Sequence, residues 1–378
     1  MSERSMKTPS GKPRARSLAV RLQGSTGAHN AITDVPGVAV GYVTLIEGHG
    51  PMRVGQGPVR TGVTAILPRG RDGVGLPCAA GFFSLNGNGE MTGVSWIEET
   101  GALASPVLLT NTHAVGACHR GIIDWTVKHR PDLAEQWLLP VVAETWDGYL
   151  NDINGNHVTP QHAVTAIDEA AAGAIEEGSV GGGTGMNCYA FKGGSGTSSR
   201  RVSFGTQSYT VGAFVQANFG SRHELTIGGT YLGEALAGDN PMENFYAKPG
   251  AGSVIAIIAT DAPLLPGQCK ALARRVPLGL ARTGTSGSHF SGDLFLAFST
   301  ANQGALVSQF SAEPKGVEDL DQLRFVQWGH MDRFYEATVQ AVEEAVLNAL
   351  TANGEMIGRD GHRTPGLPRD KVMLALRG

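Results

Sequence analysis

The sequence predicts an α+β protein in which two packed β-sheets are covered by helices. Strand-like apolar runs cluster in both halves of the chain, and helix-like runs flank them. The 53 glycines among 378 residues follow no period and separate the strands, which is typical of turn-rich β architecture. In such layers each sheet buries one face against the other sheet and the opposite face against helices.

Four strands are expected in the first third of the chain, each an apolar run bounded by Gly, Pro or Asn. They cover residues 38–46, 62–67, 79–85 and 107–110. Two Asn-Gly pairs lie between Ser84 and Glu90, and Asn-Gly is the strongest short hairpin signal. A hairpin turn is therefore expected there.

Helices are expected over 117–128 and, in a shorter form, over 131–137. Thr159 as N-cap and Pro160 at the first helical position begin an Ala-rich helix that is expected to reach Gly178. The segment from Gly178 to Ser199 is interpreted as a glycine-rich loop. It matches neither the GxGxxG nor the GxxxxGK[ST] phosphate motif, and it lacks a GxSxG elbow, so nucleotide binding and an α/β-hydrolase site are both unsupported.

The second half repeats the alternation of strands and helices. Strands are expected over 210–219, from Ser253 onward and over 294–299, and helices over 266–282 and 331–350. Pro277 is expected to interrupt the first of these helices. The last helix carries an apolar stripe that includes Val339, Val342 and Val346, as a helix packed on a sheet does.

Composition narrows the class of protein. The net charge of −4 argues against a nucleic-acid partner, and no apolar stretch approaches the ~18–20 residues that span a membrane. The four cysteines are far apart and have no metal-ligand spacing, so we expect reduced thiols, a cytoplasmic protein, and neither a metal nor another cofactor. Residues 1–16 are polar and basic and are expected to form a flexible tail.

The stretch from Lys248 to Asp261 is the most informative part of the chain, because a Pro/Gly-rich loop runs directly into an apolar, β-branched strand that begins at Ser253. If the Gly252–Ser253 bond is cut, Ser253 gains a free α-amine beside its hydroxyl. An α-amine has a pKa of about 7.7–8.0, so it can act as a base for that hydroxyl near neutral pH. The alternative is an ordinary loop entering an ordinary strand.

A second loop runs into a strand about forty residues later. Ser291 and Asp293 lie at this junction at positions i and i+2, so both side chains can point to one side of an extended segment. Together they offer a hydroxyl relay and a carboxylate that orients it and balances a developing ammonium.

With these motifs the chain resembles the β-peptidyl aminopeptidase and L-aminopeptidase/D-esterase family of self-processing serine hydrolases. Blocks that carry the resemblance extend from Asn30 to near Val346, and include 144–152 and 215–220. The resemblance implies a four-layer αββα sandwich like that of N-terminal-nucleophile hydrolases, with a topology specific to the family. Asp293 departs from the glutamate usual in the family, so the partner of this carboxylate is open.

The resemblance also implies roles for further residues. Glu144 would bind the substrate amine, Tyr149 would place a hydroxyl near the reacting carbonyl, and Asn218 would donate to the oxyanion. Read from the sequence alone, Asn218 is by default a turn cap, and Glu135 is a competing anchor for the amine. Trp137 is either a core residue or, as the resemblance implies, a border of the substrate cleft.

The sequence thus predicts a self-cleaving serine aminopeptidase that acts through an acyl-enzyme on small peptides, amino-acid amides and esters. Its parts, 17–252 and 253–378, would form one catalytic domain, and the resemblance implies a homo-oligomer, a tetramer of processed units. The preference for L-, D- or β-amino acids is left open. The alternatives are an amine acyltransferase of the glutamate/ornithine N-acetyl type, against which the serine nucleophile argues, and a non-catalytic glycine-rich binding protein.

Overall fold

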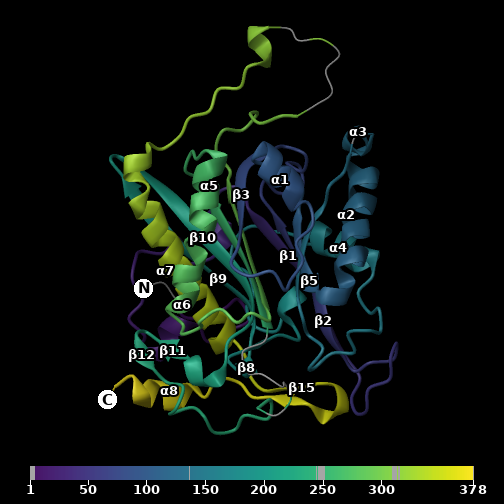
Figure 1. Cartoon of the computed structure of the whole chain (residues 1–378), viewed down its shortest axis with the longest axis vertical. Coiled ribbons are helices and arrows are strands. Elements are labelled where there is room, and N and C mark those ends of the chain that lie inside the picture. The colour runs from purple at the N-terminus through teal and green to yellow at the C-terminus, as the bar shows by residue number, and fades with distance from the viewer. Residues whose placement is uncertain are drawn as a thin grey trace.

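A computed structural model of the chain describes residues 5–135, 137–243, 245, 252–308, 313 and 316–377. Two β-sheets stack face to face between two layers of helices (Figure 1). The predicted α+β class and the αββα layering are therefore confirmed.

The larger sheet has six strands in the order β4-β3-β14-β13-β10-β9. Its pairs are antiparallel except for β13 and β14, which run parallel. The strands are β3 Cys78–Ser84, β4 Ala102–Leu103, β9 Gly194–Phe204, β10 Gln207–Asn218, β13 Gly252–Thr260 and β14 Ser291–Ser299. Its outer face is covered by α5 Pro266–Ala273, α6 Val276–Ala281 and α7 Asp332–Thr351.

The smaller sheet has four strands in the order β1-β2-β5-β6. They are β1 Ala39–Glu47, β2 Val59–Leu67, β5 Val107–Asn111 and β6 Val141–Thr145, and their outer face packs on α2 Val115–His129 and α4 Pro160–Asp168. Short elements complete the fold: α1 Val94–Thr100, α3 Pro131–Ala134, β7 Asn187–Cys188, β8 Phe191–Lys192, β11 Thr226–Ile227, β12 Thr230–Tyr231, β15 Met356–Ile357, β16 Arg363–Thr364 and α8 Arg369–Ala375.

Side-chain alternation along β13 fixes which residues face which layer. Ile255 and Ile257 point into the core between the sheets, whereas Val254 and Ala256 point toward the helices of the outer layer. Both faces are buried, which explains why this strand is a continuous apolar run in the sequence.

The expected loop from Gly178 to Ser199 is wrong at its end, because residues 194–199 begin the eleven-residue strand β9. The glycine at position 196 reflects packing against α7. A Cβ built on Gly196 would lie 2.0 Å from the carbonyl oxygen of Ala345, so only glycine lets the helix approach this closely. Turn propensity is outweighed by the burial gained from this contact.

The expected hairpin after β3 is also wrong, because the segment leads from one sheet to the other. Strand β3 pairs with β14 and β4, and the chain then bridges Met91 to Ala143 of the smaller sheet. The helix expected to reach Gly178 ends at Asp168, after which Ala171 pairs with Val40 beside β1. Main-chain bonds to the sheet outweigh the helix propensity of the alanines.

The segment expected to be a flexible tail is packed against the body where the structure describes it. Arg14 is buried and its Nε lies 2.6 Å from a carboxylate oxygen of Glu177. Arg16 lies 2.7 Å from the buried carboxylate of Glu344 in α7. These ion pairs anchor the segment, and sequence polarity alone could not reveal them.

Other expected elements agree with the structure within a few residues. Helices α5 and α6 together span the expected 266–282, with the break just before Pro277. Within the described residues, no helix combines the length and the apolar character that crossing a bilayer requires.

We predict that Gly196→Ala lowers the free energy of unfolding by about 3 kcal/mol, because the new methyl group would overlap the backbone of α7. The matched control is Gly116→Ala, since a Cβ added to Gly116 in α2 would meet no described atom within 4 Å. That change should raise stability by up to roughly 1 kcal/mol. Chemical denaturation measures both variants, and equal stabilities would contradict the close packing of β9 on α7.

Candidate active site

Ser253 is the second residue of β13, a central strand of the larger sheet. The strand register places it opposite Asn218 of β10 and opposite Gly292 of β14. Paired residues on neighbouring strands point to the same face of a sheet, so Ser253 and Asn218 both face the space between the two sheets.

The hydroxyl of Ser253 is held against the peptide bond that precedes it. Its Oγ donates to the carbonyl oxygen of Gly252 at 2.5 Å and accepts from the backbone N–H of Gly292 at 3.2 Å. A Cβ on Gly252 would lie 2.1 Å from the carbonyl oxygen of Asn218, so this position accepts only glycine. The preceding residues 246–251 lie outside the described residues.

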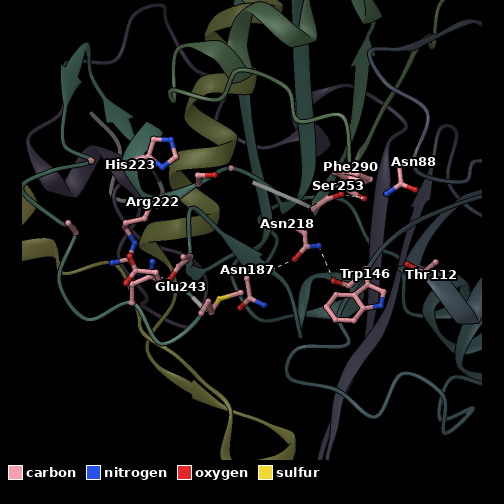
Figure 2. Close-up of a pocket in the computed structure, with 18 of the residues that line it drawn as sticks. Asn88, Thr112, Trp146, Asn187, Asn218, Arg222, His223, Glu243, Ser253 and Phe290 are labelled. Atoms are coloured by element: carbon pink, nitrogen blue, oxygen red, sulfur yellow. Dashed lines mark hydrogen bonds between the residues drawn. The ribbon is translucent and has the colours of Figure 1, made fainter. Parts of the chain in front are cut away.

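A cavity of about 700 Å³ opens beside Ser253 between the ends of the two sheets. Figure 2 shows Ser253 and Asn218 on one side of it and Trp146 and Thr112 nearby. Strand β6 and its continuation supply Glu144 and Trp146, and the remaining lining includes Asn88, Asn187, Arg222, His223, Asn240, Met242, Glu243 and Phe290.

Glu144 is a buried carboxylate in the wall of this cavity. It accepts hydrogen bonds from the hydroxyl of Thr112 and, at 2.9 Å, from the backbone N–H of Glu90. Among the described residues it forms no ion pair, and burial raises the pKa of its carboxyl group above the usual 4.5. A substrate ammonium would supply the missing positive charge.

The side-chain amide of Asn218 is oriented by two backbone groups (Figure 2). Its Oδ1 accepts from the N–H of Asn187 at 2.8 Å, and its Nδ2 donates to the carbonyl oxygen of Trp146 at 2.9 Å. The Asn187 bond decides which end of the amide is oxygen. The second hydrogen on Nδ2 is left to serve an acceptor in the cavity, which is the requirement for an oxyanion donor.

Ser291 and Asp293 form a pair of their own. The hydroxyl of Ser291 donates to Oδ1 of Asp293 at 2.5 Å. The strand register pairs these residues with Gly252 and Val254, so alternation turns their side chains away from the face that holds the Ser253 hydroxyl. The predicted pairing of Ser291 with Asp293 is present, but direct contact with that hydroxyl is not.

The partner of Asp293 that the sequence left open is Asn86. Its Nδ2 donates to Oδ2 of Asp293 at 2.8 Å, and its Oδ1 accepts from the backbone N–H of Asp293 at 2.6 Å. Burial raises the pKa of Asp293, while bonds from Ser291, Asn86 and the backbone N–H of Val254 lower it. The strand register places Asp293 opposite Val254, one residue from Ser253.

Asn86, Thr112 and Asn187 were missed at the level of sequence. Asn86 belongs to an Asn-Gly pair, and the turn signal hid its side-chain role. Thr112 and Asn187 come from short elements, a turn after β5 and the strand β7, whose position beside Ser253 is set by the packing of segments distant in the chain. No local pattern could have identified them.

Besides Ser291 and Asp293, three predicted residues do not line the cavity beside Ser253. The hydroxyl of Tyr149 donates to the carbonyl oxygen of Arg363 at 3.3 Å, and its ring stacks on His362. Trp137 is 74% exposed, which excludes a core role, and it lines a second, separate cavity. Glu135 is exposed at the end of α3.

The αββα sandwich, with a serine at the start of a central strand, defines the class of N-terminal-nucleophile-like hydrolases. The model of peptidase family S58 matches residues 30–364, and the chain belongs to this family. The chain is 47% identical over 377 residues to the β-peptidyl aminopeptidase BapA of Sphingosinicella microcystinivorans, a match that covers 97% of this chain and 92% of that protein.

Solved structures of two aminopeptidases have a similar fold and a related sequence. One is the L-aminopeptidase D-Ala-esterase/amidase of Ochrobactrum anthropi, which is described as a prototype for the serine aminopeptidases and as a new variant among the Ntn hydrolase fold. Its structure matches with a TM-score of 0.88 and 44% sequence identity, and the match covers 97% of this chain and 98% of that chain. The β-aminopeptidase of a Burkholderia species has a TM-score of 0.85 and 44% identity, over 96% and 98%.

The chain is therefore a serine-type aminopeptidase, and the family resemblance read from its motifs is confirmed. Of the three functions left open by the sequence, this membership favours the peptidase over the acyltransferase and the binding protein.

We predict that Asn86→Leu lowers the free energy of unfolding by about 3 kcal/mol near neutral pH, because it removes both bonds to Asp293 and leaves a buried carboxylate with fewer donors. Chemical denaturation measures the change. Stability equal to that of the unaltered chain would mean that Asn86 does not support this carboxylate.

Proposed function

We propose that the chain cleaves itself between Gly252 and Ser253, and that Ser253 is then the nucleophile of the aminopeptidase. The observation that carries this proposal is the 2.5 Å hydrogen bond from the Ser253 hydroxyl to the carbonyl oxygen of Gly252. The hydroxyl already lies beside the carbonyl it would attack. Gly252 offers no Cβ to obstruct that attack, and glycine is required there.

The proposed cleavage is an acyl shift followed by hydrolysis. Oγ of Ser253 attacks the carbonyl carbon of Gly252, the hydroxyl proton passes to the departing backbone nitrogen, and the amide becomes an ester. Water then hydrolyses the ester, which releases the carboxylate of Gly252 and restores the hydroxyl. The new α-amine stays next to Ser291 and Asp293, because β13 is held between β10 and β14.

In the cleaved enzyme the α-amine of Ser253 serves as general base for its own hydroxyl. Glu144 binds the substrate ammonium, and Asn218 donates its second Nδ2 hydrogen to the tetrahedral oxyanion. The departing amine takes a proton, and water hydrolyses the acyl-enzyme. Ser291 and Asp293 act on the amine from the neighbouring strand, because the register pairs Ser291 with Gly252, the residue that precedes Ser253.

The proposed substrates are short peptides, amides and esters with a free N-terminal amine and a small first residue such as alanine. Relatives carry the names β-peptidyl aminopeptidase and L-aminopeptidase D-Ala-esterase/amidase, which supports acceptance of β-residues and of both α-configurations. The backbone of the first residue would lie between Glu144 and Ser253, both of which line the same cavity.

Ser253→Ala should give a single uncut chain, because the Ser253 hydroxyl is the group that lies against the Gly252 carbonyl. Intact-mass analysis of purified protein is the measurement. Unaltered protein should give fragments 1–252 and 253–378. Ser198→Ala, which removes a buried hydroxyl of β9 bonded to the Ala341 carbonyl, is the control and should be cleaved. Two fragments from Ser253→Ala would refute the role of this serine.

Protonation of the α-amine of Ser253 sets one acid limb of kcat/KM for alanine p-nitroanilide, near a pH of about 7.7–8.0. Glu144 should set a separate acid limb, at a pH above the usual pKa of a glutamate, and the variants below act on this second limb. Burial raises the pKa of Glu144, so the carboxylate is lost as pH falls through that raised value, and ammonium binding is lost with it. Thr112→Val removes a donor that lowers this pKa, so the limb should move to higher pH. Glu144→Gln should raise KM at least about 100-fold and abolish the limb. A limb that Thr112→Val leaves in place would exclude Glu144 as its origin.

A further inference from the structure

Lys192 is a fully buried lysine whose ammonium group donates to backbone carbonyls. Its Nζ donates to Met186 at 2.6 Å, to Gly193 at 2.8 Å and to Gly183 at 3.5 Å. Burial lowers the pKa of Lys192 to about 7. Three carbonyl acceptors match the three hydrogens of an ammonium, however, and such bonds favour the charged form. Among the described residues no carboxylate lies at ion-pair distance from Lys192, although the buried Asp147 is near enough to raise its pKa, so the direct partners of the charge are these carbonyls.

The carbonyl of Met186 belongs to the same peptide unit as the N–H of Asn187. One side of this unit accepts from Lys192, and the other donates to Oδ1 of Asn218 at 2.8 Å. A single chain of hydrogen bonds therefore runs from the ammonium, through one peptide and one side-chain amide, to the Nδ2 that lines the cavity. Figure 2 shows the part of this chain that joins Asn187 to Asn218.

We infer that Lys192 is a positioning residue of the aminopeptidase, which fixes the Met186–Asn187 peptide and polarises Asn218 as an oxyanion donor. This inference rests on the proposed function of Asn218. Successive hydrogen bonds polarise one another in a low-dielectric interior, and bonds from a charged donor are the stronger ones. Electron density drawn toward the ammonium makes the Nδ2 hydrogens of Asn218 better donors.

The cost of burying a charge supports a functional reason for a lysine here. A buried charge with no carboxylate at ion-pair distance is costly, whereas a neutral amide side chain could donate to the same carbonyls without that penalty. The short β7–β8 ladder, in which Asn187 pairs with Lys192, already holds the backbone together. The charge of Lys192 is therefore not needed to hold β7 against β8, and its contribution is the polarisation of the Met186–Asn187 peptide.

A double-mutant cycle on the full-length, self-cleaved enzyme tests the inference. The variants are Lys192→Met, Asn218→Ala and the double variant. For each, kcat and KM are measured with alanine p-nitroanilide and expressed per mole of cleaved chain. The half-time of self-cleavage is measured as well. Asn218→Ala should lower kcat about 10²- to 10³-fold. Lys192→Met should lower kcat about three- to tenfold with little change in KM, because only the transition state uses the donor. In the Asn218→Ala background the same change should have less than about a twofold effect.

Each other outcome overturns part of this scheme. If Lys192→Met lowers kcat by the same factor in the unaltered enzyme and in the Asn218→Ala variant, the inference fails and the proposed function stands. The same holds if Asn218→Ala lowers kcat strongly but Lys192→Met leaves kcat unchanged. If Asn218→Ala leaves kcat unchanged, the proposed oxyanion donor fails, and the inference fails with it. Should Lys192→Met not fold, Lys192→Gln keeps a donor without the charge and completes the cycle.

Arg60 supplies the matched control. It is also a buried cation bound by backbone carbonyls, those of Glu47, Val59 and Ile357 at 2.7–2.9 Å. Its guanidinium bonds lead to these carbonyls and away from Asn218. Arg60→Met should lower Tm without lowering kcat. If it lowers kcat as much as Lys192→Met does, general loosening explains the effect and the inference is overturned.

Discussion

The register of β13 between β10 and β14 is the constraint on which the rest of the site depends. It sets Ser253 opposite Asn218 on one side and opposite Gly292 on the other. A slip of one residue would turn Ser253 toward the outer helices and bring Val254 into the cavity. The register is held by the apolar residues that follow Ser253, because they alternate between two cores that are both fully buried.

Several buried charges far from the site are paired: Arg14 contacts Glu177, and Arg16 and Arg200 share Glu344. Within the described part of the chain, the guanidinium of Arg60 is bound by backbone carbonyls alone. Near the cavity, Glu144 and Lys192 also use hydroxyls and backbone groups as partners and form no ion pair among the described residues. An unpaired charge that is connected to the cavity leaves its field available to a substrate or a transition state, as we propose for Glu144 and Lys192.

Asp293 is one methylene shorter than the glutamate usual at this position in the family, and the neighbouring residues compensate for the difference. Asn86 contacts both the side chain and the backbone of Asp293, and the hydroxyl of Ser291 donates to the other carboxylate oxygen. Gly89 and Gly292 allow the segment that follows Asn86 to lie against β14, since a Cβ on either would meet the other's backbone within 2.8 Å. The fold thus brings the loop to the carboxylate.

The sequence by itself determined the class of fold, the junction at Ser253, and the pairing of Ser291 with Asp293, because these follow from local patterns of apolar and polar residues. It also indicated Glu144 and Asn218 through the family resemblance, and both line the cavity. The sequence could not determine that residues 194–204 form a strand, that Asn86 supports Asp293, or that Trp137 and Tyr149 lie outside the cavity lining. Contacts between segments distant in the chain decide these points, since the two sheets must stack before the loops at their ends meet.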